Sequence, residues 1–127
     1  VLPGMIKQNS GSIICISSVS AQRGGGILGG PHYSAAKGGI LGLARAIARD
    51  YGGNGVRVNC ITPGLIETDI NKGKIPEDRH QAILDGIPLG RIGEPNDVAG
   101  CVTFLASDLS KYCTGITLDC NGGMLIH

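Results

Sequence analysis

The sequence predicts an α/β fold with parallel strands, on the basis of two strand candidates and the helical segment between them. Residues 13–16 read Ile-Ile-Cys-Ile, a short apolar run that is typical of a strand buried on both faces of a parallel sheet, and residues 56–62 are the next strand candidate. Residues 31–51 are rich in alanine and predict a helix about 31 Å long. Strand, helix and strand in this order are the unit of which parallel sheets are built.

Length and composition set the first limits on function. The 127 residues are enough for one modest domain with a hydrophobic core, and the net charge of +1 gives no footprint for nucleic acid or for an anionic membrane. No apolar run approaches the roughly 20 residues of a membrane span, and the first residues lack the pattern of a signal peptide. We therefore expect a cytoplasmic protein with no nucleic-acid or membrane partner.

The cysteines predict neither disulfides nor a metal site. They are odd in number, scattered, and mostly flanked by apolar residues: Cys15, Cys60, Cys101, Cys113 and Cys120. None belongs to a C-x-x-C pair, so buried reduced thiols are the better interpretation than disulfides or zinc ligands.

The first elements lead to a glycine-rich loop. Residues 1–10 predict the end of a helix whose start lies upstream, with Gly11 as its stop or as a turn residue before the strand at 13–16. Ser17 and Ser18 close that strand. The glycines after Arg23 then form a lip at its carboxyl end, which is where open α/β sheets bind ligands.

The long helix and the later elements follow from similar signals. Pro31 suits a first turn and Gly52-Gly53 ends the helix, whose many small residues permit close approach either by another element or by its own sheet. Residues 67–90 are polar and weakly periodic, so we expect one or two short helices forming a lid, with His80 as a solvated lid residue. Glu94-Pro95 opens a further helix, and residues 116–119 and 121–123 predict a strand and a turn.

Tyr33 and Lys37 are the candidates for acid–base chemistry. Four residues apart on a helix, they share one face. A free tyrosine has a pKa of about 10, and a lysine ammonium one turn away favours the phenolate that acts as a base. Taken alone, this spacing more often marks a packed tyrosine and a solvated lysine than a catalytic pair.

Five motifs in fixed order favour the catalytic interpretation. They are Gly-Ser-Ile-Ile-Cys-Ile-Ser-Ser from Gly11, Tyr-Ser-Ala-Ala-Lys from Tyr33, Val-Arg-Val-Asn-Cys-Ile-Thr-Pro-Gly-Leu-Ile-Glu-Thr from Val56, Gly-Arg-Ile-Gly-Glu-Pro-Asn-Asp-Val-Ala from Gly90, and Asn-Gly-Gly from Asn121. Together they resemble the short-chain dehydrogenase/reductase family, nearest in wording to 3-oxoacyl-acyl-carrier-protein reductases. The resemblance implies that residues 1–127 are the C-terminal catalytic half of one Rossmann-type, doubly wound domain, without the first βαβ unit that binds the dinucleotide phosphates.

The resemblance also implies a set of site residues. Ser18 is the catalytic hydroxyl, with Ser20 as a weaker rival, and Tyr33 and Lys37 complete the set while also binding the cofactor. Further cofactor-side residues follow the second strand: Pro63, Gly64, Ile66 and Thr68. The cofactor implied is NAD or NADP. These residues do not decide between the two, because the residue that usually discriminates between them belongs to the first half of such a domain.

The function implied is interconversion of a secondary alcohol and a ketone by hydride transfer in a homo-oligomer, dimer or tetramer, with residues 124–127 at a subunit interface. Two alternatives stay open at this point. One is a non-catalytic oligomerising or regulatory fragment, and the other is an epimerase or dehydratase of the same fold.

Overall fold

Three parallel strands form one sheet in the computed structural model, which describes residues 1–71 and 73–127. β1 spans Gly11–Ile16, β2 spans Val56–Pro63 and β3 spans Thr117–Cys120, in the order β1-β2-β3. Because all described pairings are parallel, the carboxyl ends of the strands meet at one edge of the sheet. The predicted α/β class with parallel strands is confirmed.

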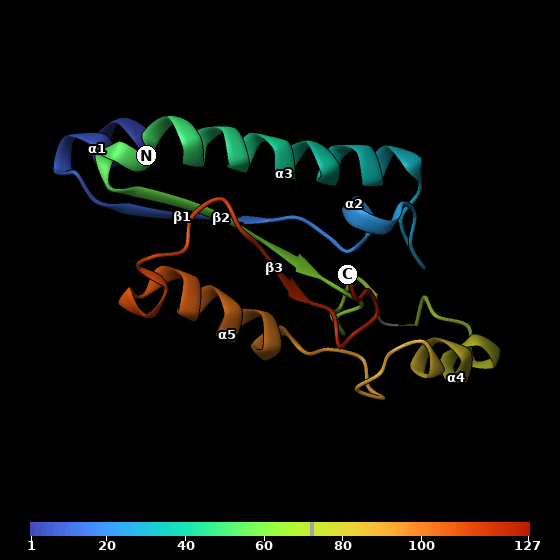
Figure 1. Cartoon of the computed structure of the whole chain (residues 1–127). Helices are drawn as coiled ribbons and strands as arrows, with labels where there is room; N and C mark the ends of the chain where they lie inside the picture. The colour runs from blue at the N-terminus through green and yellow to red at the C-terminus, as the bar shows by residue number, and fades with distance from the viewer. Residues whose placement is uncertain (72) are drawn as a thin grey trace.

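Helices cover both faces of this sheet. In Figure 1, α1 and α3 lie over one face and α5 lies over the other, so the layers are those of a doubly wound fold. The helices are α1 (Leu2–Gln8), α2 (Ser20–Arg23), α3 (Pro31–Tyr51), α4 (Glu77–Asp85) and α5 (Pro95–Ala106), with short 3₁₀ turns at Gly52–Asn54 and Asp108–Ser110. Among the described residues, no helix combines the length and the apolarity needed to cross a membrane.

The main core lies between α3 and the sheet. Every second residue of β2 points into it, as the period of a strand requires: Val56, Val58 and Cys60. The matching residues of α3 are three and four positions apart and so share one helix face: Leu41, Ala44 and Ala48. Ala44 and Ala48 let the helix lie close to its own sheet. Most of the other small residues of the helix are exposed, so approach by another element stays a prediction for them: Ala35, Ala36, Gly39, Gly42 and Ala46.

The turn between α1 and β1 differs from the expectation. Asn9, not Gly11, ends the helix: it adopts a left-handed conformation (φ 56°), and its N–H donates to the carbonyl of Ile6 at 3.1 Å. Gly11 is already the first residue of β1. A Cβ at Gly11 would lie 2.5 Å from Sδ of Met5, so the glycine is needed for close packing of the strand against α1.

The polar segment predicted as a lid, residues 67–90, lies between two residues that pair with each other outside the three-stranded sheet. Ile66 and Gly93 form an isolated parallel bridge, and backbone hydrogen bonds of 2.8 and 3.0 Å tie Gly93 to the residues on either side of Ile66. One helix, α4, forms between them, in line with the expectation of one or two short helices. Lys72, within the predicted lid 67–90, lies outside the described residues.

Candidate active site

A cavity of about 480 Å³ opens at the carboxyl ends of β1 and β2. Four of the predicted site residues line it: Ser18, Tyr33, Gly64 and Thr68. They come from the end of β1, the first turn of α3 and the segment after β2. We call this space the strand-end cavity; it lies where the fold class places ligands.

The serines at the end of β1 point in different directions. The hydroxyl of Ser17 donates to the carbonyl of Lys37 at 2.8 Å, and Ser17 does not line the cavity. Ser18 and Ser20 both line it, and the Ser18 hydroxyl accepts the N–H of Ser20 at 3.1 Å. Ser18 therefore keeps its own hydroxyl proton for another acceptor, while Ser20 stands beside it as the neighbouring hydroxyl.

Tyr33 and Lys37 come together as their spacing predicts. Pro31 opens α3, which places the Tyr33 ring at the cavity with 38% of the residue exposed. The ring lies against Gly29, where a Cβ would approach Cδ1 of the ring to 2.7 Å. One turn later, Nζ of Lys37 lies 5.8 Å from the ring centroid and donates to the carbonyl of Ile16 at 2.9 Å.

The residues after β2 divide between two cavities. The N–H of Val19 donates to the carbonyl of Pro63 at 3.0 Å, which ties the serine turn to the end of β2 and to Gly64. Thr68 lines the strand-end cavity, but Ile66 lines a second cavity of about 450 Å³ together with Gly93. The structure thus places Ile66 apart from the other predicted cofactor-side residues. His80 is exposed on α4, as expected of a solvated lid residue.

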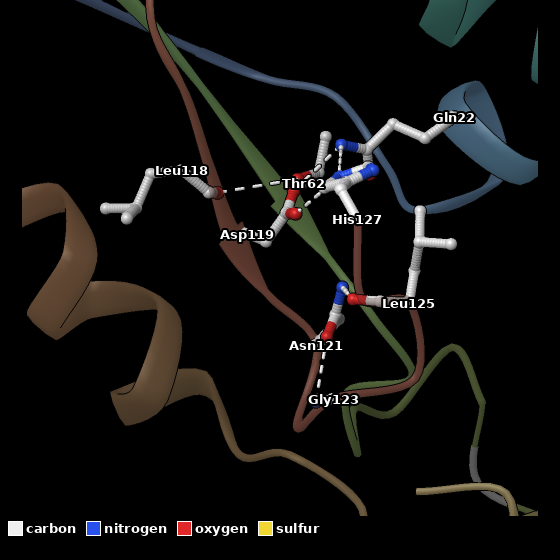
Figure 2. A network of polar contacts seen from close by, with 8 residues as sticks. All are labelled: Gln22, Thr62, Leu118, Asp119, Asn121, Gly123, Leu125 and His127. Atoms are coloured by element: carbon white, nitrogen blue, oxygen red, sulfur yellow. Dashed lines mark hydrogen bonds and ion pairs between the residues drawn. The ribbon is translucent and has the colours of Figure 1, made fainter.

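A polar network near the carboxyl end of β3 joins α2, β2 and the C-terminal tail through the carboxylate of Asp119 (Figure 2). Asp119 lines the second cavity and not the strand-end cavity. Gln22 of α2 donates from Nε2 to Oδ1 at 2.9 Å, Thr62 of β2 donates from its hydroxyl to the same oxygen, and Nε2 of His127 lies 2.9 Å from Oδ2. Burial acts to raise the pKa of the Asp119 carboxyl, but the hydrogen bonds from Thr62, Gln22 and His127 outweigh it and hold this pKa below its ordinary value of 3.8.

The turn after β3 carries the tail back to the cavity. The side chain of Asn121 accepts the N–H of Gly123 at 2.8 Å and donates to the carbonyl of Leu125 at 3.2 Å (Figure 2), and Gly122 and Gly123 have positive φ angles of 66° and 88°. The predicted turn is confirmed, and it places Met124 in the wall of the strand-end cavity.

Sequence reasoning missed Met124 in the wall of the strand-end cavity, and it missed the network in which Gln22 donates to Asp119. Within the chain, His127 contacts Asp119; the assignment of residues 124–127 to a subunit interface stays a prediction. The one signal for the network was a carboxylate inside the short strand Thr-Leu-Asp-Cys, because a charged residue there needs partners.

Two strand cysteines, Cys60 of β2 and Cys120 of β3, are poor candidates for reactive groups. Burial, reinforced by the facing thiol of Cys15, raises the pKa of Cys60 to about 11. Burial also raises the pKa of Cys120 to about 11, with Cys101 as its thiol neighbour. All five cysteines are free, and thiols with such pKa values are uncharged at neutral pH and poor nucleophiles.

Asp119→Asn is expected to lower the free energy of unfolding at pH 7 by about 1 kcal/mol, because hydrogen bonds to an ionised carboxylate are lost. A carboxyl whose pKa is lower in the folded state stabilises the fold above its unfolded value and loses this contribution as pH falls through the folded value. The deficit of the variant should therefore shrink below pH 3.8. Urea unfolding at pH 7 and pH 3, with exposed Asp50→Asn as control, tests this; a deficit independent of pH would contradict it.

Comparison with known proteins gives a consistent set of relatives. Residues 1–125 match the family model described as Enoyl-(Acyl carrier protein) reductase. The chain is 60% identical over 126 residues to an uncharacterized short-chain type dehydrogenase/reductase of Sinorhizobium fredii, covering 99% of this chain and 50% of that protein. It is 43% identical over 129 residues to a 3-oxoacyl-[acyl-carrier-protein] reductase of Thermotoga maritima, again covering 99% of this chain and 50% of the relative.

A solved structure with bound NADP, named after 2-deoxy-d-gluconate 3-dehydrogenase and from Agrobacterium tumefaciens, superposes with a TM-score of 0.89 at 35% identity. The superposition covers 97% of this chain and 50% of that one. The chain thus spans about half the length of the curated relatives and of the solved structure that it matches.

Proposed function

Because the chain belongs to the short-chain dehydrogenase/reductase family, we propose that the protein carrying it is an NAD(P)-dependent oxidoreductase that interconverts a secondary alcohol and a ketone. The observation that carries the proposal is the meeting of Ser18 and Tyr33 in one cavity with the Lys37 ammonium 5.8 Å from the Tyr33 ring. A hydroxyl, a phenol and a fixed cation are the groups that proton transfer to or from an alcohol oxygen requires.

Each residue of this set has one task in the proposal. The Ser18 hydroxyl donates a hydrogen bond to the substrate oxygen and holds it within reach of Tyr33. In the oxidative direction, the phenolate of Tyr33 takes the hydroxyl proton of the alcohol; in the reductive direction, the phenol returns it. The ammonium of Lys37, anchored to the carbonyl of Ile16, favours the phenolate by its charge.

The residues present fit the nicotinamide end of a dinucleotide. Around the strand-end cavity they offer the hydroxyls of Ser18, Tyr33 and Thr68 beside the Pro63-Gly64 turn, and its volume lies within the range of ligand sites. A bound nicotinamide would supply or accept the hydride at the carbinol carbon. Pro63, Gly64 and Thr68 are proposed to hold this end, with Tyr33 and Lys37 toward the ribose. Ile66, the fourth cofactor-side residue that the resemblance implies, lines the neighbouring cavity.

We also propose that residues 1–127 are the catalytic half of one Rossmann-type domain and that the lid 67–90 covers the substrate. Two observations support the first part: β1 is an edge strand of the described sheet, and the relatives are twice as long. The names of relatives, which include a 3-oxoacyl reductase and a gluconate dehydrogenase, support an alcohol or ketone substrate. We also propose that the protein is cytoplasmic and forms a homo-oligomer, either a dimer or a tetramer.

The test is a titration of NADH and NADPH fluorescence with the protein that carries this chain, followed by turnover with a panel of secondary alcohols. Saturable binding and steady net formation of NAD(P)H are expected. Absence of saturable binding would instead favour a non-catalytic fragment. Binding without net formation of NAD(P)H would favour an epimerase or dehydratase.

Lys37→Met is expected to move the pH–rate profile for alcohol oxidation toward higher pH and to raise the KM for the cofactor, because the cation beside Tyr33 is removed. Lys7→Met, on α1 and away from the strand-end cavity, is the matched control. The measurement is kcat and KM between pH 6 and 10. An unchanged pH profile would remove the electrostatic role assigned to Lys37.

A further inference from the structure

The strand-end cavity has an uneven charge. Among its described lining residues, Arg23 is the one permanently charged side chain, and no aspartate or glutamate lines it. Glu67 and Asp69 flank Thr68 in the sequence but are not part of the described lining. The described wall is therefore positive at one place and neutral elsewhere.

Arg23 is exposed and makes no side-chain hydrogen bond or ion pair with any described residue. Exposed Arg45, Arg49 and Arg79 share this property, but Arg23 is the one arginine among the described lining residues of the cavity. Two other arginines have internal partners. Arg57 donates to the carbonyl of Leu105 at 3.0 Å, and Arg91 makes a two-pronged pair with Asp97 at 2.7 and 2.8 Å. A guanidinium that has no internal partner keeps its donors for a ligand, and their planar fork matches a carboxylate.

The backbone beneath Arg23 is held in place, which a specific contact requires. Its N–H donates to the carbonyl of Val19 at 3.1 Å, so it belongs to the same short turn that follows Ser18. Beyond it, the N–H of Gly25 donates to the hydroxyl of Ser34 at 2.9 Å, which fixes the loop to α3. The preceding residue, Gln22, anchors α2 to Asp119 (Figure 2).

The remaining residues of the cavity wall indicate which kind of ligand the cavity favours. Apart from the hydroxyls of Ser18 and Tyr33 and the guanidinium of Arg23, much of the described lining is aliphatic: Ile27, Leu28, Leu65, Ile70 and Met124. Such a wall favours an aliphatic carbon chain over a polyhydroxylated one, because hydroxyl groups placed against it would lose their hydrogen bonds with water.

We propose that Arg23 binds the carboxylate of the substrate, which is then a hydroxy or oxo acid with an aliphatic segment between the reacting carbon and the anionic group. This inference rests on the proposed function, because it needs the carbinol carbon to lie at Ser18 and Tyr33. It assigns Arg23 to substrate recognition and leaves the proton transfer with Tyr33.

The test compares each acid with its methyl ester, which keeps the carbon chain and the hydroxyl but lacks the charge. The probes are 3-hydroxybutyrate, 3-hydroxyhexanoate and 3-hydroxyoctanoate with their methyl esters, and kcat/KM is measured for each with NAD or NADP. At least one acid should be preferred over its ester by about 10- to 100-fold, the range of a charged hydrogen bond. Arg23→Gln should remove the preference through KM, and Arg23→Lys should restore part of it.

Arg49→Gln is the matched control, since Arg49 is exposed on α3 and does not line the cavity; it should leave the preference unchanged. Equal use of acids and esters, a preference for esters, or a preference that survives Arg23→Gln would overturn the proposal. A rise in the KM for the cofactor alone would also overturn it, because Arg23 would then bind a cofactor phosphate.

Equilibrium binding of the same acids, followed by ligand-observed NMR, separates this proposal from the proposed function. If neither acids nor esters are turned over, the proposed function fails with this panel, and binding decides on Arg23. Binding of an acid that is lost in Arg23→Gln supports the anion site, and acid binding that is absent or unaffected by the variant overturns it.

Discussion

Tyr33→Phe is expected to reduce turnover by about 100- to 10,000-fold, the range for loss of a general acid or base, while the affinity for NADH or NADPH stays close to that of the unchanged protein. The variant loses one hydroxyl and keeps the ring. Since the ring lies against Gly29, the first turn of α3 should retain its packing. The effect should therefore fall on kcat and leave the fluorescence titration of the cofactor nearly unchanged.

Tyr112→Phe is the matched control, because Tyr112 is fully exposed and does not line the strand-end cavity. It should have no measurable effect on turnover or on cofactor affinity. Near-normal turnover of Tyr33→Phe would show that the phenol does not transfer the proton, and Ser18 or Ser20 would then have to be examined by Ser→Ala variants.

Gly55→Ala is expected to lower the free energy of unfolding by at least about 3 kcal/mol. Gly55 has a φ of 70°, which alone costs an alanine about 1–2 kcal/mol. The added Cβ would also overlap the backbone oxygen of Asn9, so the chain between α1 and β1 would have to move. The same segment holds the start of the sheet, since the N–H of Gly11 donates to the carbonyl of Gly55 at 3.2 Å.

Urea unfolding followed by circular dichroism measures this loss. Gly53→Ala, two residues earlier, is the control: a Cβ there meets no atom within 4 Å, and its φ is not positive, so the change should stay within about 1 kcal/mol. Equal stabilities of the two variants would contradict the steric argument.

The regular elements could be predicted because their signals are local. The helix 31–51 was found with its observed bounds, since Pro31 suits a first turn and Gly52-Gly53 stops the pattern. The predicted strands agree with the observed ones to within two residues at each end, and β3 lies one residue later than predicted. The prediction that Gly11 ends the first helix is wrong. A glycine in a sequence does not show whether it is needed for a left-handed turn or for a close contact, here with Met5.

The candidate site and the polar network around Asp119 could be predicted only in part. Tyr33 and Lys37 are four residues apart on one helix, so their meeting follows from helix geometry. Asp119 meets Gln22 across 97 residues and Gln22 meets His127 across 105, and no local pattern specifies such contacts. The pairing of Ile66 with Gly93 is also a contact between distant residues, so the sequence does not predict that Ile66 lies in the neighbouring cavity.

The bridge between Ile66 and Gly93 affects which insertions and deletions the fold can tolerate during evolution. Because Ile66 and Gly93 clamp the two stems together, the stretch between them is a closed loop whose ends are fixed independently of what it contains. Lengthening a closed loop costs little, since a doubling adds only about 0.6 kcal/mol of closure entropy. The stretch can thus be shortened or extended while the sheet and the residues around the strand-end cavity stay as they are.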